Sequence, residues 1–287
     1  MEIGVSEAMS YDENTPNPQG RTAMKESHPR EDRNFDDLAD RFAKNIYGTI
    51  KGRIRLALLT EDLTELVSGL YGGAQPLDIL DAGCGMAQMG CELAGQGHRV
   101  HFCDLSKRML ELADAMASEA QVMERCSFHQ GPFQDFIQDK DEGFQLILFH
   151  AVLEWLVAPK ASLEALVDSL APGGTLSLMF YNVNCLIQRN ATFGNFRKVM
   201  SGEFGGLSQS FTPLHPLDPA EVEGWVAGMG LTVVRKTGVR VFTDYMTKDV
   251  QKARSYEDTL EVERAYCRKE PFASMGRYVH LLCRKAS

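Results

Sequence analysis

Short apolar runs alternate along this chain with longer segments whose hydrophobic residues recur at helical spacing. The runs have the length of strands buried in a parallel sheet, and the periodic segments between them have the length of crossover helices. This alternation predicts a doubly wound α/β sheet. Its expected first five strands are Leu77–Leu80, Arg99–Cys103, Cys126–His129, Phe144–Phe149 and Thr175–Phe180. Two later segments, Leu231–Tyr245 (a strand or bent strand) and Arg277–Arg284, are expected to pair antiparallel and bring the sheet to seven strands.

Two helices are predicted before the first strand. Asn34 is placed to cap the first, with apolar residues on one face until the break at Gly48. Leucines at helical spacing from Leu56 to Leu70 predict the second, which ends near Gly72. Additions of this kind can fold over the carboxyl ends of the strands, where ligands bind in open α/β sheets. Several polar side chains could then reach a ligand: Tyr47, Lys51, Arg53 and Arg55.

The chain is interpreted as a tail followed by one domain. Residues 1–31 are polar, lack hydrophobic periodicity and are expected to be disordered. Residues 32–287 form the domain, with residues 32–73 as the helical N-terminal addition. A helix is expected to continue through Leu170 and stop at Pro172. Residues 181–217, after the fifth strand, are predicted to be a long irregular insertion on the substrate side, because long connections in compact domains are usually functional.

A glycine turn joins the first strand to the following helix. Asp81 ends the strand, and Gly83 and Gly85 follow, where the absence of a Cβ allows a tight turn and close approach of a ligand. The second strand delivers Asp104, an acid that can accept hydrogen bonds from both hydroxyls of a ribose. A dinucleotide fingerprint requires a glycine where Gln88 stands. A nucleotide site is therefore expected, with an NAD-dependent enzyme as the least favoured interpretation.

These residues, together with the later Leu170–Gly174 segment LAPGG, resemble the S-adenosylmethionine-binding core of class I methyltransferases. The resemblance implies that the glycine loop lies under the methionine part of the cofactor and that Asp104 holds the ribose. It also implies that Phe133 and Gln134, in a turn after the third strand, contact the adenine. Ala87 stands where the family usually has a third glycine.

His150 follows the fourth strand at the same edge of the sheet, where a ligand contact is favoured over a purely structural role. Trp155 lies among Val152, Leu153 and Leu156 and is expected to be a core residue.

Composition and charge narrow the setting. No run of about twenty apolar residues and no signal segment is present, so a soluble, cytoplasmic protein is expected. The seven cysteines form no C-x-x-C pair, which favours reduced, mostly buried thiols over a metal site. The net charge is −9, yet residues 181–287 hold 15 Lys and Arg against 11 Asp and Glu. This asymmetry suggests a carboxy-terminal part that faces an anionic partner, although a solvated basic face is the commoner cause.

Longer segments narrow the resemblance to one family. They include Arg33–Asp37, Asn45–Thr49, Leu146–Trp155, Ser177–Asn182 and Lys236–Phe242, and they are similar to the tRNA 5-carboxymethoxyuridine methyltransferase family from about Asp32 to the end of the chain. The resemblance implies a class I, Rossmann-like methyltransferase that esterifies the carboxylate of 5-carboxymethoxyuridine at the wobble position, within the tRNA anticodon stem-loop. The cofactor contacts that it implies are Arg55, Gly83, Cys84, Gly85, Asp104, Phe133, Gln134 and His150.

The implied reaction suits a chain without an obvious catalytic dyad. A carboxylate is ionised near neutral pH and can attack a sulfonium methyl group without a general base. Tyr181, Arg189 and Arg240, together with Arg55, are the candidates to hold the substrate carboxylate or a nearby phosphate. The predicted tRNA face comprises Arg189, Arg197, Lys198, Arg235, Lys236, Arg268 and Lys269.

Two further functions remain open from the sequence. A methyltransferase for a small carboxylic acid or a quinone-like metabolite would share every cofactor residue and would need no tRNA. A non-catalytic protein that senses S-adenosylmethionine would bind the cofactor and transfer nothing.

Overall fold

The computed structural model describes residues 31–39, 49–71, 75–138, 142–205, 213 and 215–287. Residues 1–30 of the predicted tail and residues 40–48 of the predicted first helix lie outside this part. Glu31–Ser287 form one compact unit. None of its described helices is long and apolar enough to cross a bilayer.

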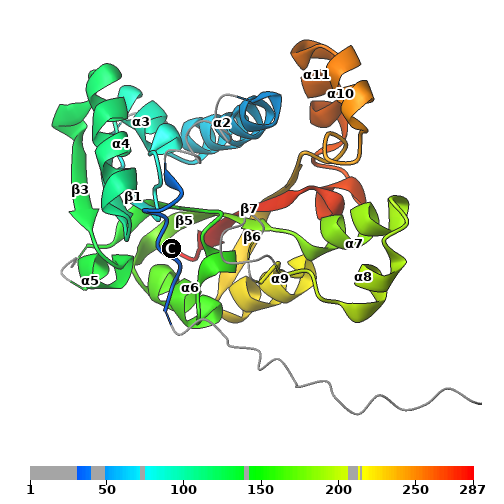
Figure 1. The fold of residues 1–287 in the computed structure, drawn as a ribbon. Coiled ribbons are helices and arrows are strands. Elements are labelled where there is room, and N and C mark those ends of the chain that lie inside the picture. The colour runs from blue at the N-terminus through cyan, green and yellow to red at the C-terminus, as the bar shows by residue number, and fades with distance from the viewer. Residues whose placement is uncertain (1–30, 40–48, 72–74, 139–141, 206–212, 214) are drawn as a thin grey trace, which may run out of the picture. The chain divides into compact units, whose positions relative to one another are not determined.

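A seven-stranded sheet runs through this unit in the order β3-β2-β1-β4-β5-β7-β6 (Figure 1). The first five strands are parallel, and β7 pairs antiparallel with both β5 and β6. The predicted doubly wound sheet and its antiparallel end are therefore confirmed. The strands are β1 Asp78–Ala82, β2 Arg99–Asp104, β3 Cys126–Gln130, β4 Phe144–His150, β5 Leu170–Tyr181, β6 Leu231–Val239 and β7 Tyr278–Lys285.

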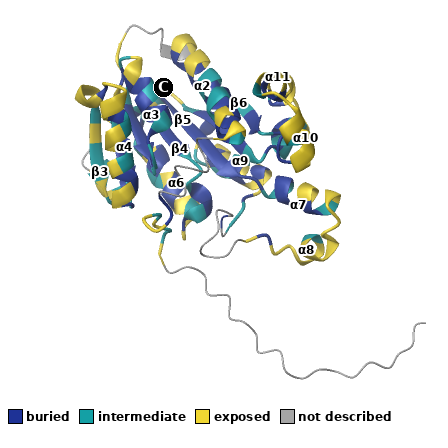
Figure 2. Ribbon diagram, turned by 45° about the horizontal axis from the view of Figure 1, so that its top comes forward, coloured by how far each residue is buried: buried dark blue, intermediate teal, exposed yellow. Residues whose placement is uncertain are grey.

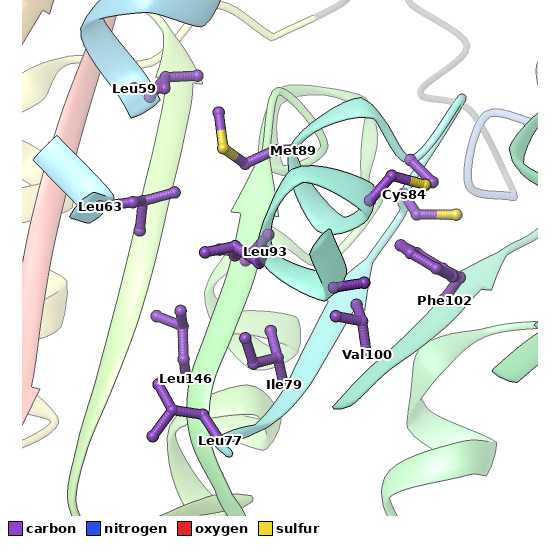
Figure 3. Close-up of a cluster of buried hydrophobic side chains, with 14 of the residues drawn as sticks. Leu59, Leu63, Leu77, Ile79, Cys84, Met89, Leu93, Val100, Phe102 and Leu146 are labelled. Carbon is purple, nitrogen blue, oxygen red and sulfur yellow. The ribbon is translucent and has the colours of Figure 1, made fainter. Parts of the chain in front are cut away.

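Helices cover both faces of the sheet (Figure 2), and the sheet separates the two largest hydrophobic clusters of the described residues. Alternate residues of β1 point to opposite faces, so Ile79 joins one cluster and Leu80 the other. Figure 3 shows the first cluster, in which Leu63 and Leu93 from two helices pack over Ile79 and Leu146 of the sheet. Its helices are α2 Ile50–Tyr71, α3 Gln88–Gly95 and α4 Lys107–Glu119. The opposite face carries α5 Phe133–Ile137, α6 Pro159–Asp168 and α9 Pro219–Gly228.

Side-chain caps begin two of these helices. Ser106 Oγ accepts a hydrogen bond from the Met109 N–H at 3.0 Å at the start of α4. Asp218 Oδ1 accepts one from Ala220 N–H at 2.8 Å, and Pro219 occupies the first turn of α9. Both caps satisfy backbone donors that a helix leaves unpaired, which is why the polar residue before each apolar run predicts the boundary.

The Pro-Gly-Gly segment after α6 differs from the prediction. The helix ends at Asp168, and β5 already begins at Leu170, with a register shift against β4. Gly173 has φ +72°, and a Cβ on Gly174 would meet the carbonyl oxygens of Ala171 and Phe144 at 2.8 Å. The two glycines therefore form an irregularity inside a long strand and do not terminate the helix.

The insertion after β5 is also more regular than predicted. It contains α7 Val183–Thr192, capped by Asn182, and α8 Phe196–Ser201, separated by Gly194 at φ +75°. Short helices broken by a glycine leave too little periodicity to recognise in a sequence. Two further helices, α10 Lys248–Ala253 and α11 Tyr256–Tyr266, lie between β6 and the last strand. Three 3-10 turns complete the described elements: η2 Met123–Arg125, η3 Leu153–Trp155 and η4 Phe272–Met275.

Candidate active site

A cavity opens at the carboxyl ends of β1, β2, β4 and β5, the edge where open α/β sheets bind ligands. Among the candidates for holding the substrate carboxylate, Tyr181, at the end of β5, lines the cavity, whereas Arg189 and Arg240 do not. All eight predicted cofactor residues line the cavity: Arg55, Gly83, Cys84, Gly85, Asp104, Phe133, Gln134 and His150. Their convergence is what the sequence pattern predicts, but a cofactor contact by any one of them stays a prediction.

The glycine turn is held tightly under this cavity. The backbone N–H groups of Gly83 and Cys84 both donate to the Cys103 carbonyl, at 2.8 and 3.0 Å. Gly83 has φ +68°, and a Cβ there would lie 2.5 Å from Val152, so a side chain is excluded. Ala87 adopts φ +58°, the left-handed conformation that the usual glycine would take more easily. The turn therefore keeps its shape at the expense of strain at Ala87.

Two carboxyl groups lie beside the turn. Asp104 Oδ2 accepts a hydrogen bond from Gly85 N–H at 2.9 Å, and Oδ1 accepts one from Ser106 N–H at 2.8 Å. Burial raises the pKa of Asp104, although these backbone hydrogen bonds oppose the shift. Burial and the nearby Asp104 raise the pKa of Asp81 to about 7. The cavity thus carries concentrated negative potential that a cationic ligand would relieve.

Phe133 and Gln134 begin the short helix α5 and do not form the predicted turn. The Phe133 side chain is 6% exposed and packs edge to face on Phe149, with ring centroids 5.6 Å apart. The Gln134 amide donates a long hydrogen bond of 3.4 Å to Ser162 Oγ. The Phe133 side chain therefore belongs both to the hydrophobic core and to the cavity wall.

His150 begins a buried hydrogen-bonded chain that crosses the sheet. Its Nε2 lies 2.7 Å from Ser177 Oγ, which lies 2.8 Å from His280 Nε2. His280 Nδ1 lies 2.9 Å from Asp62 Oδ2 on α2. Because Nε2 of His150 is committed to Ser177, Nδ1 is the ring nitrogen left for a ligand. Burial chiefly, and then the charges of His280 and Arg55, hold the pKa of His150 well below its usual range, so the ring is neutral.

Asp62 anchors the far end of that chain and is fully buried. Its Oδ1 accepts hydrogen bonds from Arg268, at 2.7 and 3.0 Å, and from Arg235 at 3.2 Å. Burial would raise the pKa of Asp62, but hydrogen bonding to His280 and the charges of His280 and Arg268 lower it well below its usual value. An ionised Asp62 accepts a hydrogen bond from the Nδ1–H group of His280, and this fixes the orientation of both imidazole rings.

Several residues of the cavity wall were not predicted from the sequence. Tyr278, the first residue of β7, pairs in register with Tyr181, and their rings lie edge to face at 5.3 Å. Trp155, expected in the core, lines the cavity against Phe35, with ring centroids 5.0 Å apart. Three buried polar atoms of the lining residues, Tyr181 Oη, Gln88 Oε1 and Arg33 Nε, have no hydrogen-bond partner among the described residues. Such atoms indicate a polar ligand.

A second cavity adjoins the first, and Arg240 lines it. Arg240 adopts φ +62°, and its Nε lies 2.8 Å from Asp244 Oδ2. Lys51 Nζ lies 3.1 Å from the other oxygen of Asp244, whose carbonyl accepts a 3.1 Å hydrogen bond from Arg189 Nε. Asp244 therefore binds three cationic side chains, those of Lys51, Arg189 and Arg240, through its carboxylate or its backbone carbonyl. The Arg53 guanidinium instead lies over the Tyr256 ring at 3.7 Å, and Tyr47 is outside the described residues.

The predicted tRNA face is divided by the fold. Arg235, Lys236 and Arg268 form ion pairs of 2.7 to 3.2 Å with acidic residues of the same chain. Arg197 and Lys198 are exposed on α8. The exposed aromatic residues Phe193 and Phe196 stand beside them, 46% and 65% exposed. The side chains of Arg197, Lys198, Phe193 and Phe196 are thus open to solvent, which suits RNA contact.

The seven cysteines are free, and all except Cys126 are buried. Burial raises the pKa of the Cys84 thiol well above its usual value, so at the cavity wall it is a neutral group.

The sheet order, the glycine turn and the strand-end acid define a class I, Rossmann-like methyltransferase. A family model described as a methyltransferase domain matches residues 79–174. Among solved structures, magnesium protoporphyrin IX methyltransferase from Synechocystis PCC 6803, with bound SAH, shares the fold at TM-score 0.57 and 16% identity, covering 88% of this chain and 96% of its own. N-methyltransferase NodS from Bradyrhizobium japonicum WM9, with S-adenosyl-L-homocysteine, gives TM-score 0.53 at 16% identity, covering 89% and 100%.

A closer relative identifies the family within this class. The tRNA 5-carboxymethoxyuridine methyltransferase of Escherichia coli (strain K12) is 43% identical over 89% of this chain and 97% of its own length. The chain belongs to the tRNA 5-carboxymethoxyuridine methyltransferase family.

Proposed function

We propose that this enzyme transfers a methyl group from S-adenosylmethionine to the carboxylate of 5-carboxymethoxyuridine in tRNA and forms the methyl ester. The observation that carries the proposal is the near full-length match to a relative of that name, on a chain whose predicted cofactor residues all line one cavity. An acceptor of this kind implies work in the cytoplasm, where tRNA is modified. The single-stranded anticodon loop is the proposed target, because its bases are accessible without opening a duplex.

The residues around the cavity fit S-adenosylmethionine. The glycine turn offers a surface free of side chains, and Asp104 retains lone pairs for the two ribose hydroxyls. Burial and mutual repulsion raise the pKa of Asp81, and burial raises that of Asp104, so a ligand that carries positive charge would be stabilised beside them by favouring their ionised forms. The unpartnered Gln88 Oε1 would accept a hydrogen bond from an N–H or O–H group of the ligand. When bound, S-adenosylmethionine supplies an electrophilic methyl group on a positively charged sulfur.

The protein's own contribution to the reaction is positioning. A substrate carboxylate oxygen attacks the methyl carbon, an oxygen–carbon bond forms, the carbon–sulfur bond breaks, and the electron pair stays on sulfur. No proton moves, so no general base is needed. Holding the reacting atoms in line can supply roughly 7 to 11 kcal/mol of the barrier reduction.

Tyr181 is the residue best placed to orient the substrate carboxylate. Its hydroxyl is buried, lines the cavity and has no partner among the described residues. Burial raises the pKa of Tyr181 above its usual value, so the hydroxyl stays protonated and can donate a hydrogen bond. We assign this bond to the oxygen that does not attack, because a strong contact to the attacking oxygen would favour the ground state over the transition state.

Arg55 adds a positive charge at the same wall. Its side chain is almost buried and lines both cavities, with the guanidinium 6.0 Å from the centre of the Tyr278 ring. A guanidinium in this position would draw the acceptor carboxylate toward the cavity. Arg189 and Arg240, which stand outside the first cavity, remain candidates for contacts to the tRNA backbone.

The test is incorporation of labelled methyl from S-adenosylmethionine into tRNA that carries 5-carboxymethoxyuridine, beside the same tRNA without the modification. Label in the first tRNA alone, released by mild alkali as an ester should be, supports the proposal. Label in a small carboxylic acid without tRNA would instead show a metabolite methyltransferase. Cofactor binding with no transfer to any acceptor would show a binding protein.

A further inference from the structure

The second cavity differs from the first in its charge. It has a volume of about 450 Å³, within the range of small-molecule sites. It lies between the start of α2, the bend after β6 and helix α10, which Figure 1 shows facing the start of α2. Five of its ten described lining residues are cationic, and none is acidic: Thr49, Ile50, Lys51, Gly52, Arg55, Arg240, Lys248, Gln251, Lys252 and Tyr278.

Among the described residues, one buried acid pairs with two of these cations. Asp244 stands behind the wall, 7% exposed, and pairs with both Lys51 and Arg240. The first turn of α2, a helix of 22 residues, contains no acidic residue. Its amino-terminal dipole therefore adds to the positive potential of the cavity. Lys248 and Lys252 are exposed at the rim.

The two cavities meet at shared residues. Arg55 and Tyr278 line both of them. A ligand in the second cavity would therefore lie next to whatever occupies the acceptor side of the first. This rests on the proposed function, in which that acceptor is one nucleotide of an RNA strand. A nucleotide on an RNA strand brings its neighbouring phosphates with it.

We propose that the second cavity is a binding site for a backbone phosphate adjacent to the nucleotide that is methylated. A helix amino terminus and flexible ammonium groups suit a phosphate, which presents charge in all directions. Asp244 holds Lys51 and Arg240 in place from behind, so part of the site is ordered before RNA arrives. The site thereby contributes to the affinity for RNA and to the position of the RNA strand relative to the first cavity. Methyl transfer itself takes place in the first cavity.

Binding measurements test this site with the full-length protein. The variant Lys248→Gln/Lys252→Gln removes two exposed cations of the rim. The matched control, Arg125→Gln/Lys160→Gln, removes two exposed cations that do not line either cavity. The probe is an anticodon stem-loop RNA in which single phosphates flanking the target nucleotide are replaced, one at a time, by uncharged methylphosphonates.

The rim variant should bind the RNA that carries no methylphosphonate about tenfold more weakly than the wild type does in moderate salt. The slope of log affinity against log salt should fall by about 0.7 for each phosphate that the variant no longer neutralises. One methylphosphonate should weaken binding to the wild-type and control proteins clearly more than binding to the rim variant, because two of the charges that face this phosphate are already gone. Affinity for S-adenosylmethionine should be the same in all three proteins.

Additive effects of the rim variant and every methylphosphonate would overturn the proposal, as would a rim variant that binds RNA like the control. The readout is equilibrium binding, so it does not depend on turnover. If the effects of the rim variant and of every methylphosphonate on binding are additive but methylation is intact, the phosphate site alone is refuted. If these effects are not additive but tRNA that carries 5-carboxymethoxyuridine is not methylated, the result supports the phosphate site and refutes the proposed reaction.

Discussion

Asp81 offers a direct test of the electrostatics of the first cavity. It ends the apolar part of β1, is 5% exposed and has a pKa of about 7 against the ordinary 3.8, because of burial and the neighbouring Asp104. Asp81→Asn keeps the size of the side chain and removes its charge. The substitution should therefore change how stability depends on pH while leaving the packing of the glycine turn intact.

The pKa values of Asp81 in the folded and in the unfolded chain set the sign and the size of this pH dependence. The folded state retains a proton that the unfolded chain releases, so wild-type stability falls as pH rises through the interval from about 4 to about 7. A shift of about three units corresponds to about 4 kcal/mol in total. About 2 kcal/mol of this falls between pH 5 and pH 7. Above pH 8 the contribution of Asp81 is constant.

Urea unfolding at several pH values measures this contribution. The free energy of unfolding of Asp81→Asn minus that of the wild type should rise by about 2 kcal/mol from pH 5 to pH 7 and then level off. Asp135→Asn, at an exposed position, is the matched control for removal of one carboxyl group. Parallel stability curves for the wild type and Asp81→Asn would refute the assignment of a raised pKa to this group.

Three other substitutions probe other parts of the site. Ser177→Ala removes the shared partner of His150 and His280 and should lower the free energy of unfolding in urea by about 1 to 3 kcal/mol; an unchanged value would show that the buried chain contributes nothing to stability. Ala87→Gly should raise the unfolding free energy by about 1 kcal/mol by relieving the left-handed conformation, and a decrease would contradict the strain. Tyr181→Phe should leave stability within about 0.5 kcal/mol, because the hydroxyl has no partner among the described residues, yet lower kcat at least tenfold. Equal kcat for Tyr181→Phe and wild type would remove Tyr181 from the mechanism.

Local patterns predicted the cofactor half of the molecule well. The apolar runs and the turn residues of that half lie next to one another in sequence, so the positions of the strands and of the glycine turn follow from short-range rules. His150 could be placed because it ends an apolar run that is long enough to be central. The same reasoning placed Gly83 and Asp104.

The remainder depends on contacts between distant segments. Tyr278 reaches the cavity only because β7 pairs with β5, about 100 residues earlier, in a register that sequence does not encode locally. The pairing of Asp62 with His280, Arg235 and Arg268 has the same origin, and it explains why a count of basic residues overstated the predicted tRNA face. Trp155 was assigned to the core because the segment around it is apolar, although its ring belongs to the cavity wall.

The reversed direction of β7 separates the chain into parts that can change independently. Because this strand runs against β5, the segment that enters it arrives at the same edge where the parallel strands end. The chain up to β5 therefore supplies every described residue that lines the first cavity except Tyr278, while the chain after it contributes Tyr278 to both cavities and Arg240 and helix α10 to the second. Replacement of the later portion could give an enzyme of this class a new acceptor while its cofactor chemistry is inherited unchanged.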